Sequence, residues 1–287
     1  MISANNVTKQ YNDFTLNISM QVVPGCITGL VGKNGSGKST TIKSMLGLIK
    51  PDSGEIHILG KEPNELTPDD KQSLGVALSD SGFSAYLTVN DVIHILKKSY
   101  HNFDVNSFTR KCKEQGLPTN KLIQKFSSGM KAKLRVLVAL SHNAKLIIMD
   151  EPTAGMDVQA RNEILDLLRN YVTEHEDSSI LITSHIATDL ESLCDDIYLI
   201  NNGTIVLHED TDVILSDYAV LKIEDRTFQS LDKSYVISTK KEQYHYCCLT
   251  NQKQFYMENY PGIIIEKCGI DVLILLLTGG QSNEWTN

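Results

Sequence analysis

The chain has 287 residues, of which 41% are hydrophobic, and its 35 acidic against 27 basic side chains give a formal net charge of -8. This length supports one large hydrophobic core and a smaller second domain, because folding units cluster at about 100 to 200 residues. The acidic balance argues against a nucleic-acid surface, which needs clustered positive charge, so we expect no nucleic-acid partner.

The cysteines and the apolar runs limit the cellular setting. Six cysteines occur without a CxxC pair, so the sequence predicts neither a zinc site nor a disulfide framework and favours a reducing compartment. The N-terminus has no basic region followed by an apolar stretch, so we expect no secretory signal. The most apolar run, residues 270–277, is shorter than the roughly 20 residues that cross a membrane. Any membrane role is therefore expected to come through a partner.

Residues 1–208 alternate short β-branched runs with longer amphipathic stretches. This pattern is typical of a mostly parallel sheet covered by helices. We expect core strands at residues 27–31, 74–78, 146–150 and 179–183. Further strands, partly antiparallel, are expected at residues 2–8, 14–22 and 55–59. The prediction is an α/β fold with a β-rich flank.

Two other regions have different patterns of apolar and polar residues. No strand pattern occurs between residues 88 and 143, where helices are expected at residues 89–100, 106–116 and 128–142. After residue 216, short strands are expected at residues 218–223, 234–239, 244–250 and 262–266, followed by an apolar helix at 270–277. The predicted domains are thus residues 1–215, with a helical subdomain at about 88–143, and a small α+β accessory or dimerisation domain at 216–287.

A phosphate-binding loop is the first chemical motif. The segment GKNGSGKST at residues 32–40 lies between an apolar strand and a helix, which is the context that this motif requires. Its glycines let backbone amides surround phosphate oxygens, Lys38 neutralises the β and γ phosphates, and the Ser39 hydroxyl reaches magnesium. The residues predicted to bind nucleotide here are Asn34, Gly35, Ser36, Gly37, Lys38, Ser39 and Thr40.

Two carboxylates follow a buried strand, in the segment LIIMDE at residues 146–151. Open α/β sheets collect their ligands at the carboxyl ends of strands. Asp150 is placed to hold magnesium through water, and Glu151 to polarise the attacking water. Beside the phosphate loop, this pair favours a catalytic role over two acidic residues that merely end a strand.

A phosphate loop alone could belong to a GTPase, a kinase or a helicase, and four further elements narrow the choice. FSSGM at residues 126–130 is similar to a signature motif, AGMD at 154–157 to a D-loop, and TSH at 183–185 to a switch-histidine segment. Tyr11 matches an adenine-stacking aromatic. Through the order and spacing of these motifs, residues 1 to about 210 resemble the ATP-binding subunit of an ABC transporter.

That resemblance implies a mechanism and partners. Two such domains dimerise head to tail, and the signature residues Ser127, Ser128 and Gly129 of one subunit close over ATP bound by the other. It implies ATP and Mg²⁺ as ligands, with Glu151, His185 and Lys38 as catalytic residues and Asp157 and Tyr11 as nucleotide contacts. It also implies membrane-spanning permease subunits, a second ATPase subunit in a homodimer or heterodimer, and a place at the cytoplasmic face of the cell membrane.

Departures from the family pattern carry information too. Ser79 stands where the Q-loop glutamine is expected, followed by Asp80, and either oxygen side chain can serve magnesium. The segment KFSSGMK at residues 125–131 resembles the Ser-x-Gly-Met-Lys form found in ABC-2-type exporters, among them bacterial exporters of drugs and antimicrobial peptides. Export of drugs or peptides is the function that this resemblance implies.

Three alternatives stay open at this stage. The chain could be an ABC ATPase that never meets a membrane, although it lacks the second ATPase domain of translation factors and the long coiled-coil insertion of repair proteins. It could be a regulator without catalysis, which the presence of Lys38, Asp150, Glu151 and His185 argues against. The apolar helix at 270–277 could be buried within its own domain or form a dimer contact.

Overall fold

The computed structural model describes residues 1–279. A sheet of nine strands forms its centre, in the order β4-β1-β2-β9-β8-β3-β7-β6-β5. Its strands are β1 (Ile2–Gln10), β2 (Thr15–Val22), β3 (Ile27–Val31), β4 (Ser53–Ile58), β5 (Leu74–Ala77), β6 (Leu146–Asp150), β7 (Ser179–Ser184), β8 (Asp196–Asn201) and β9 (Thr204–Asp210). Strands β5, β6, β7, β3 and β8 pair in parallel, whereas β1 pairs antiparallel with β2 and β4. The predicted parallel core and antiparallel flank are confirmed.

The central strands are buried on both faces, which explains their mostly apolar sequences. Every residue of β3 and β6 is buried. Parallel strands covered on both faces have this composition. Val31 of β3 pairs with Ser184 of β7, and Asp150 of β6 pairs with Thr183 of β7. The carboxyl ends of these three strands therefore meet at one edge of the sheet.

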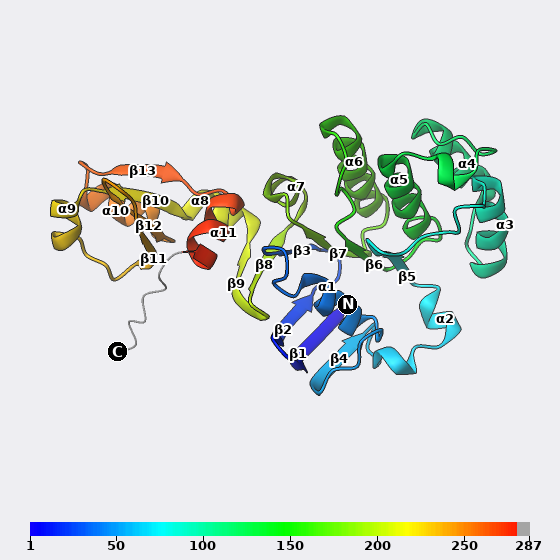
Figure 1. Cartoon of the computed structure of the whole chain (residues 1–287), viewed down its shortest axis with the longest axis horizontal. Coiled ribbons are helices and arrows are strands. Elements are labelled where there is room, and N and C mark those ends of the chain that lie inside the picture. The colour runs from blue at the N-terminus through cyan, green and yellow to red at the C-terminus, as the bar shows by residue number, and fades with distance from the viewer. Residues whose placement is uncertain (280–287) are drawn as a thin grey trace.

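Helices cover the two faces of this sheet (Figure 1). Helix α1 (Lys38–Met45) lies on the same side as the antiparallel flank, and its Ile42 and Met45 pack with Leu146 and Ile148. Helices α5 (Ser128–Ala139), α6 (Val158–Glu174) and α7 (Ala187–Leu193) cover the other face. Alternate residues of each strand thus point into two separate apolar clusters.

The segment between β5 and β6 is helical and extends away from the sheet (Figure 1). It contains α3 (Val89–Ser99), α4 (Val105–Glu114), a short 3-10 turn (Ile123–Lys125) and α5. Thr88 and Asp104 cap the first two helices through side-chain hydrogen bonds, as Ser and Asp-type caps do. A shared apolar cluster that includes Val92, Phe108 and Leu137 holds the helices together. The predicted helices of this region are confirmed; β4 and β5 are joined by the smaller helices Pro63–Glu65 and α2 (Pro68–Lys71).

The C-terminal part contains a second sheet of four antiparallel strands in the order β11-β12-β10-β13. Its elements are α8 (Thr211–Asp217), β10 (Ala219–Ile223), α9 (Asp225–Ser230), β11 (Val236–Lys241), β12 (Tyr246–Thr250), α10 (Lys253–Asn259), β13 (Ile264–Lys267) and α11 (Ile270–Gly279). The four predicted strands and the apolar helix are present. The proposed boundary between residues 215 and 216 lies inside α8, and residues 280–287 lie outside the described residues, so the two-domain division stays a prediction.

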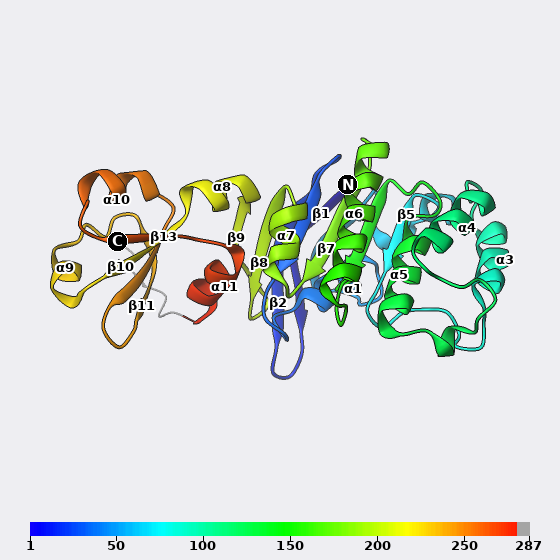
Figure 2. The same cartoon turned by 90° about the horizontal axis from the view of Figure 1, so that it is seen from above.

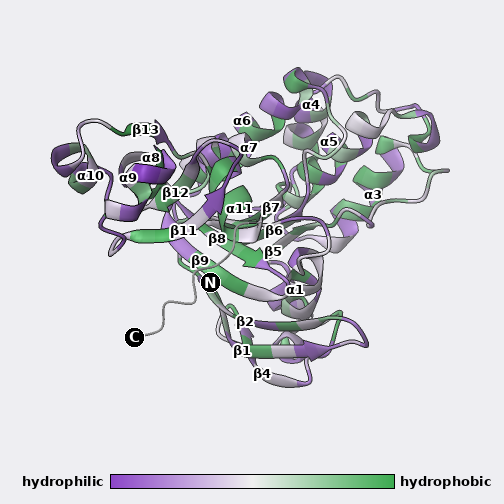
Figure 3. Ribbon diagram, turned by 60° about the vertical axis from the view of Figure 1, so that its left-hand side comes forward, coloured by the Kyte–Doolittle hydropathy of each residue, from purple (hydrophilic) through white to green (hydrophobic). Residues whose placement is uncertain are grey.

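Helix α11 lies between the two sheets, where it contacts α7 and β11 (Figure 2). Its first backbone amide, at Ile270, donates to Oε1 of Glu191 in α7 at 2.6 Å. Leu273 and Leu276 pack in the same apolar cluster as Leu190 of α7. Figure 3 shows α11 as a hydrophobic helix, and its buried face is used within the chain. On the other side of α11, the apolar side chain of Leu275 is 47% exposed.

None of the helices within residues 1–279 has the length and apolar content needed to cross a membrane.

Candidate functional site

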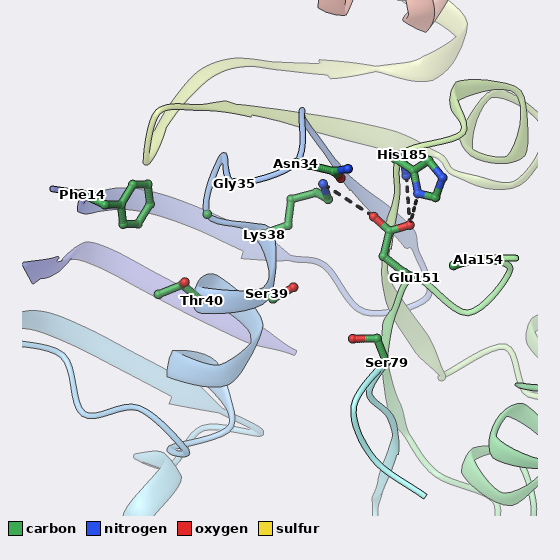
Figure 4. Close-up of a pocket in the computed structure, with 11 residues that line it drawn as sticks. Phe14, Asn34, Gly35, Lys38, Ser39, Thr40, Ser79, Glu151, Ala154 and His185 are labelled. Atoms are coloured by element: carbon green, nitrogen blue, oxygen red, sulfur yellow. Dashed lines mark hydrogen bonds and ion pairs between the residues drawn. The ribbon is translucent and has the colours of Figure 1, made fainter. Parts of the chain in front are cut away.

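A cavity of about 450 Å³ opens beside the phosphate loop, at the edge where β3, β6 and β7 end (Figure 4). Its lining comes from three parts of the chain: the phosphate loop with the start of α1, the segments that follow β5, β6 and β7, and the turn before β2. The lining residues are Phe14, Asn34, Gly35, Gly37, Lys38, Ser39, Thr40, Ser79, Glu151, Ala154 and His185. Most of the predicted phosphate-loop residues are thus brought together with the predicted catalytic residues Glu151 and His185.

The shape of the phosphate loop depends on two glycines. A Cβ atom at Gly32 would lie 2.3 Å from the carbonyl oxygen of Ile200, so no side chain fits there. Gly37 has a φ of 116°, in the left-handed region that favours glycine, and it is the N-cap of α1. The amide groups at the start of α1 consequently face the cavity, where the positive end of the helix dipole favours an anion.

Lys38 is buried, and its ammonium group lies between the phosphate loop and Glu151. Its Nζ donates to the carbonyl oxygen of Gly32 at 2.7 Å and lies 3.6 Å from Oε1 of Glu151. Lys38 is 6% exposed, so its charge acts in a poorly solvated region, where electrostatic interactions are stronger than in water. The lysine therefore brings a positive charge to the helix start and the carboxylate.

Glu151 has an uncommon backbone conformation. Its φ is 51°, in a region that residues other than glycine rarely adopt and that is typical of functional sites. The backbone N–H of Glu151 donates to Oγ1 of Thr183 at 2.9 Å, which holds this turn against β7. Its Oε2 is 2.5 Å from Nδ1 of His185 and accepts from the His185 backbone N–H at 3.2 Å. The carboxylate is held between Lys38 and His185 (Figure 4).

Below Glu151, three hydroxyl groups converge on the buried carboxylate of Asp150. Ser39 and Ser79 both donate to Oδ2, at 2.9 and 3.1 Å, and Thr183 donates to Oδ1 at 2.7 Å. One carboxylate and two serine hydroxyls within hydrogen-bond distance form an all-oxygen donor set, which is the chemistry that Mg²⁺ prefers. The residues present therefore fit a magnesium ion at Ser39, Ser79 and Asp150.

Asp80 does not join this oxygen cluster. Its carboxylate accepts from Nζ of Lys43 at 2.6 Å, and this hydrogen bond holds the pKa of Asp80 below its usual value. The guanidinium of Arg135 in α5 donates to the carbonyl oxygen of Ser79 at 2.7 Å. These two contacts hold the adjacent residues Ser79 and Asp80, and it is Ser79, not Asp80, that hydrogen-bonds to Asp150.

Six predicted nucleotide contacts lie outside the cavity lining, namely Tyr11, Ser36, Ser127, Ser128, Gly129 and Asp157. Ser127 caps α5 by accepting from the backbone N–H of Met130, and Asp157 caps α6 by accepting from that of Ala160. Ser127, Ser128 and Asp157 are exposed, and Gly129 is half-buried. Ser36 is buried within the phosphate loop, where its side chain is not part of the lining.

The two aromatic residues before the phosphate loop differ in their position. Tyr11 is 42% exposed and does not line the cavity, whereas Phe14 does. Their rings are 6.2 Å apart, and the Tyr11 backbone N–H donates to the carbonyl oxygen of Phe14 at 2.8 Å. Sequence reasoning missed Phe14 and Ala154 as lining residues. The one available signal for Phe14 was an aromatic side chain three positions from Tyr11.

Comparisons with known proteins identify the family of this chain. The family model described as ABC transporter matches residues 15–154. The chain is 34% identical to the bacitracin transport ATP-binding protein of Bacillus licheniformis over 210 residues, which cover 72% of this chain and 68% of that protein. It is 33% identical to the linearmycin resistance ATP-binding protein of Bacillus subtilis (strain 168) over 213 residues, with the same coverages.

A solved structure described as the ATP-binding subunit of an ABC transporter has the same fold. It superposes with a TM-score of 0.66 at 24% sequence identity, covering 75% of this chain and 91% of that one. The two chains therefore share one fold. The family match and the curated relatives show that this chain belongs to the ABC transporter family, as an ATP-binding and ATP-hydrolysing subunit that powers transport through separate membrane subunits.

Proposed function

We propose that Glu151 activates water for hydrolysis of ATP bound in the cavity, and that Lys38 and His185 position it. The observation that carries this proposal is the pair of contacts on one carboxylate: Oε1 faces Lys38 at 3.6 Å, and Oε2 faces His185 at 2.5 Å. A general base must lie within hydrogen-bond reach of its proton, directly or through one water. Glu151 meets the cavity from the side opposite the start of α1 (Figure 4).

Lys38 has two roles in this proposal. In the described conformation its ammonium group donates to the Gly32 carbonyl oxygen. Phosphate oxygens at the start of α1 would offer Lys38 stronger, charge-assisted hydrogen bonds than a carbonyl group. Movement of Lys38 to the phosphates would weaken its contact with Glu151, which would then be available to orient water. Nucleotide binding and activation of the base are thus linked through one lysine.

Magnesium is the second ligand in the proposal, held by Ser39, Asp150 and Ser79. A magnesium ion bound there would supply positive charge that neutralises the nucleotide phosphates. Asp150 is 2% exposed and already accepts three hydroxyl hydrogen bonds, so its orientation is set by its neighbours. Ser79 takes the place of a longer amide side chain and keeps an oxygen near the same carboxylate.

A second ATPase subunit is the third element. Ser127, Ser128, Gly129 and Asp157 lie at the beginnings of α5 and α6, outside the cavity, and three of them are exposed. Helix starts are favourable for the γ phosphate, whose charge they complement. We propose that these residues close the nucleotide site of a partner ATPase subunit, in a homodimer or a heterodimer.

Membrane permease subunits and an exported substrate complete the proposal. The names of two relatives refer to bacitracin transport and linearmycin resistance. With the KFSSGMK segment, they support export of peptides or other antimicrobial compounds as the process that this ATPase powers, at the cytoplasmic face of the membrane.

One experiment tests whether Ser127 acts on the nucleotide of a partner subunit or on the nucleotide in the cavity of its own subunit. In the complex with its membrane subunits, Ser127→Arg should lower ATP hydrolysis at least about tenfold, because the larger cation obstructs closure over the partner's nucleotide. ATP affinity of the isolated chain should not change. Ser99→Arg, the same change at an exposed position of α3, is the control. Loss of ATP affinity in isolated Ser127→Arg would contradict the interface role.

A further inference from the structure

A second group of polar side chains lies in the C-terminal part of the chain, where β11 and β12 form a hairpin. Glu242, His245 and Cys247 each offer one ligand atom, and these three atoms lie within 4.8 Å of one another. Within residues 1–279, no other group of His, Cys, Asp and Glu side chains has this arrangement. We propose that these three residues form a binding site for a divalent transition metal of the Zn²⁺ type, separate from the nucleotide site.

The hairpin holds the three side chains near one another. The backbone N–H of Glu242 donates to the carbonyl oxygen of His245 at 2.9 Å and closes the turn. Lys240 pairs with Cys247 across the two strands. His245 lies in the turn, one residue before β12 (Tyr246–Thr250), and Cys247 is the second residue of that strand. The turn thus brings the Glu242 carboxylate and the His245 ring near the Cys247 thiol.

His245 carries the second, independent observation. Its Nε2 lies 3.3 Å from Oε2 of Glu242. This nitrogen is fully buried, yet it has no hydrogen-bond partner among the described residues, because the carboxylate does not meet it at a hydrogen-bonding angle. Buried polar atoms nearly always have a partner. A metal ion between the nitrogen, the carboxylate and the thiol would satisfy this one.

The distances and the ligand types both suit zinc. Bonds of about 2.0 to 2.3 Å in a tetrahedral site place neighbouring ligand atoms about 3.5 Å apart. Oε2 of Glu242 and Nε2 of His245 are already 3.3 Å apart. Side-chain movements of about 1 Å would bring all three ligand atoms to the separation of a tetrahedral site. A thiol, an imidazole and a carboxylate form a set that zinc accepts, whereas Mg²⁺ and Ca²⁺ prefer oxygen alone. The fourth position would hold water.

The two lysines nearest the proposed site are each paired with a carboxylate, so their positive charges are partly neutralised. Lys222 donates to Glu266 at 2.6 Å, and Nζ of Lys240 is 3.9 Å from Oε1 of Glu242, the oxygen that does not face His245. Each ammonium group therefore already has a carboxylate partner. Cys247 belongs to the apolar cluster that continues into the first sheet. An ion bound at the hairpin would be anchored on the core that the two sheets share. The site contains one cysteine, so a search for CxxC pairs cannot find it.

Metal titration of the untagged, nucleotide-free full chain tests the proposal. We expect Zn²⁺ to bind at one equivalent in calorimetry and to raise the Tm. Co²⁺ in the same site should give a near-ultraviolet charge-transfer band, which requires a thiolate ligand. Cys247→Ser should remove this band. Both Cys247→Ser and His245→Gln should weaken Zn²⁺ binding at least about tenfold, since loss of a ligand costs no less than loss of its supporting contacts.

Two controls make the outcome decisive. Cys26→Ser changes the least buried of the six cysteines and should leave Zn²⁺ affinity and the Co²⁺ band unchanged. His245 is partly exposed, so His245→Gln should keep the fold, which circular dichroism checks, even if Cys247→Ser does not. Absence of stoichiometric Zn²⁺ binding, or binding that is the same in folded His245→Gln, would overturn the proposal.

Discussion

The ammonium group of Lys38 and the carboxylate of Glu151 face each other 3.6 Å apart, although 113 positions separate the two residues in the sequence. Lys38 follows β3 and Glu151 follows β6, and the intervening strand β7 holds both ends at one edge of the sheet. A binding residue and a proposed catalytic residue are thus in direct contact, so changes at either should be distinguishable by their effects on affinity and on rate.

Glu151→Gln should abolish turnover and keep ATP binding. The amide preserves the shape of the side chain but is a poor proton acceptor, and general-base catalysis contributes about 10²- to 10⁴-fold. Hydrolysis rate and ATP affinity should be measured on the same protein. Near-normal hydrolysis would remove Glu151 from the role of base.

Lys38→Ala should weaken ATP binding about 10- to 100-fold, because hydrogen bonds to charged groups contribute about 1.5 to 3 kcal/mol. Lys33→Ala is the matched control in the same loop, since Nζ of Lys33 points to the carbonyl oxygen of Thr278, at 3.5 Å. Equilibrium binding of a fluorescent ATP analogue gives both affinities. Equal losses in the two variants would show that general loop charge, and not the position of Lys38, binds the phosphates.

Tyr11→Ala should raise the KM for ATP about fivefold with little change in kcat, if Tyr11 stacks on adenine as the sequence predicts. Because Phe14 lines the cavity and Tyr11 does not, Phe14→Ala belongs in the same experiment. A normal KM in Tyr11→Ala together with a raised KM in Phe14→Ala would assign the stacking role to Phe14.

Leu273→Ala should lower the free energy of unfolding by about 2 to 5 kcal/mol, the usual cost for a buried leucine. Leu273 is fully buried between α11 and α7, whereas Leu275 on the same helix is 47% exposed, so Leu275→Ala should cost much less. Urea unfolding should show one transition that shifts as a whole. Two transitions, of which only one shifts, would mean that the C-terminal part unfolds independently.

His142 should make the protein less stable in mild acid. Burial lowers the pKa of His142, more than the hydrogen bond between its Nε2 and the carbonyl oxygen of Leu74, at 2.9 Å, raises it. Below the unfolded pKa of about 6.5, the unfolded chain binds a proton that the native chain excludes, so stability is lost as pH falls. His142→Gln should reduce the fall in Tm between about pH 7 and pH 5. If the fall in Tm is the same in His142→Gln, another group causes the loss of stability in acid.

The sequence by itself determined the features that depend on neighbouring residues. The phosphate loop is contiguous, and its glycines and lysine occupy positions set by the loop's own geometry. The buried strands β3 and β6 are mostly apolar, and the cap residues Thr88 and Asp104 precede their helices. In each of these, the physical cause acts within one element, so local sequence suffices to predict it.

Only the tertiary structure decided which distant residues meet. Ser79 and Thr183 contact Asp150 because β5 and β7 pair on either side of β6, an order that no local pattern specifies. The positive φ of Glu151 and the packing of α11 against α7 likewise depend on contacts between separate elements. Periodicity shows which face of a strand or helix is buried, but the neighbour that buries it is chosen by the packing of the whole chain.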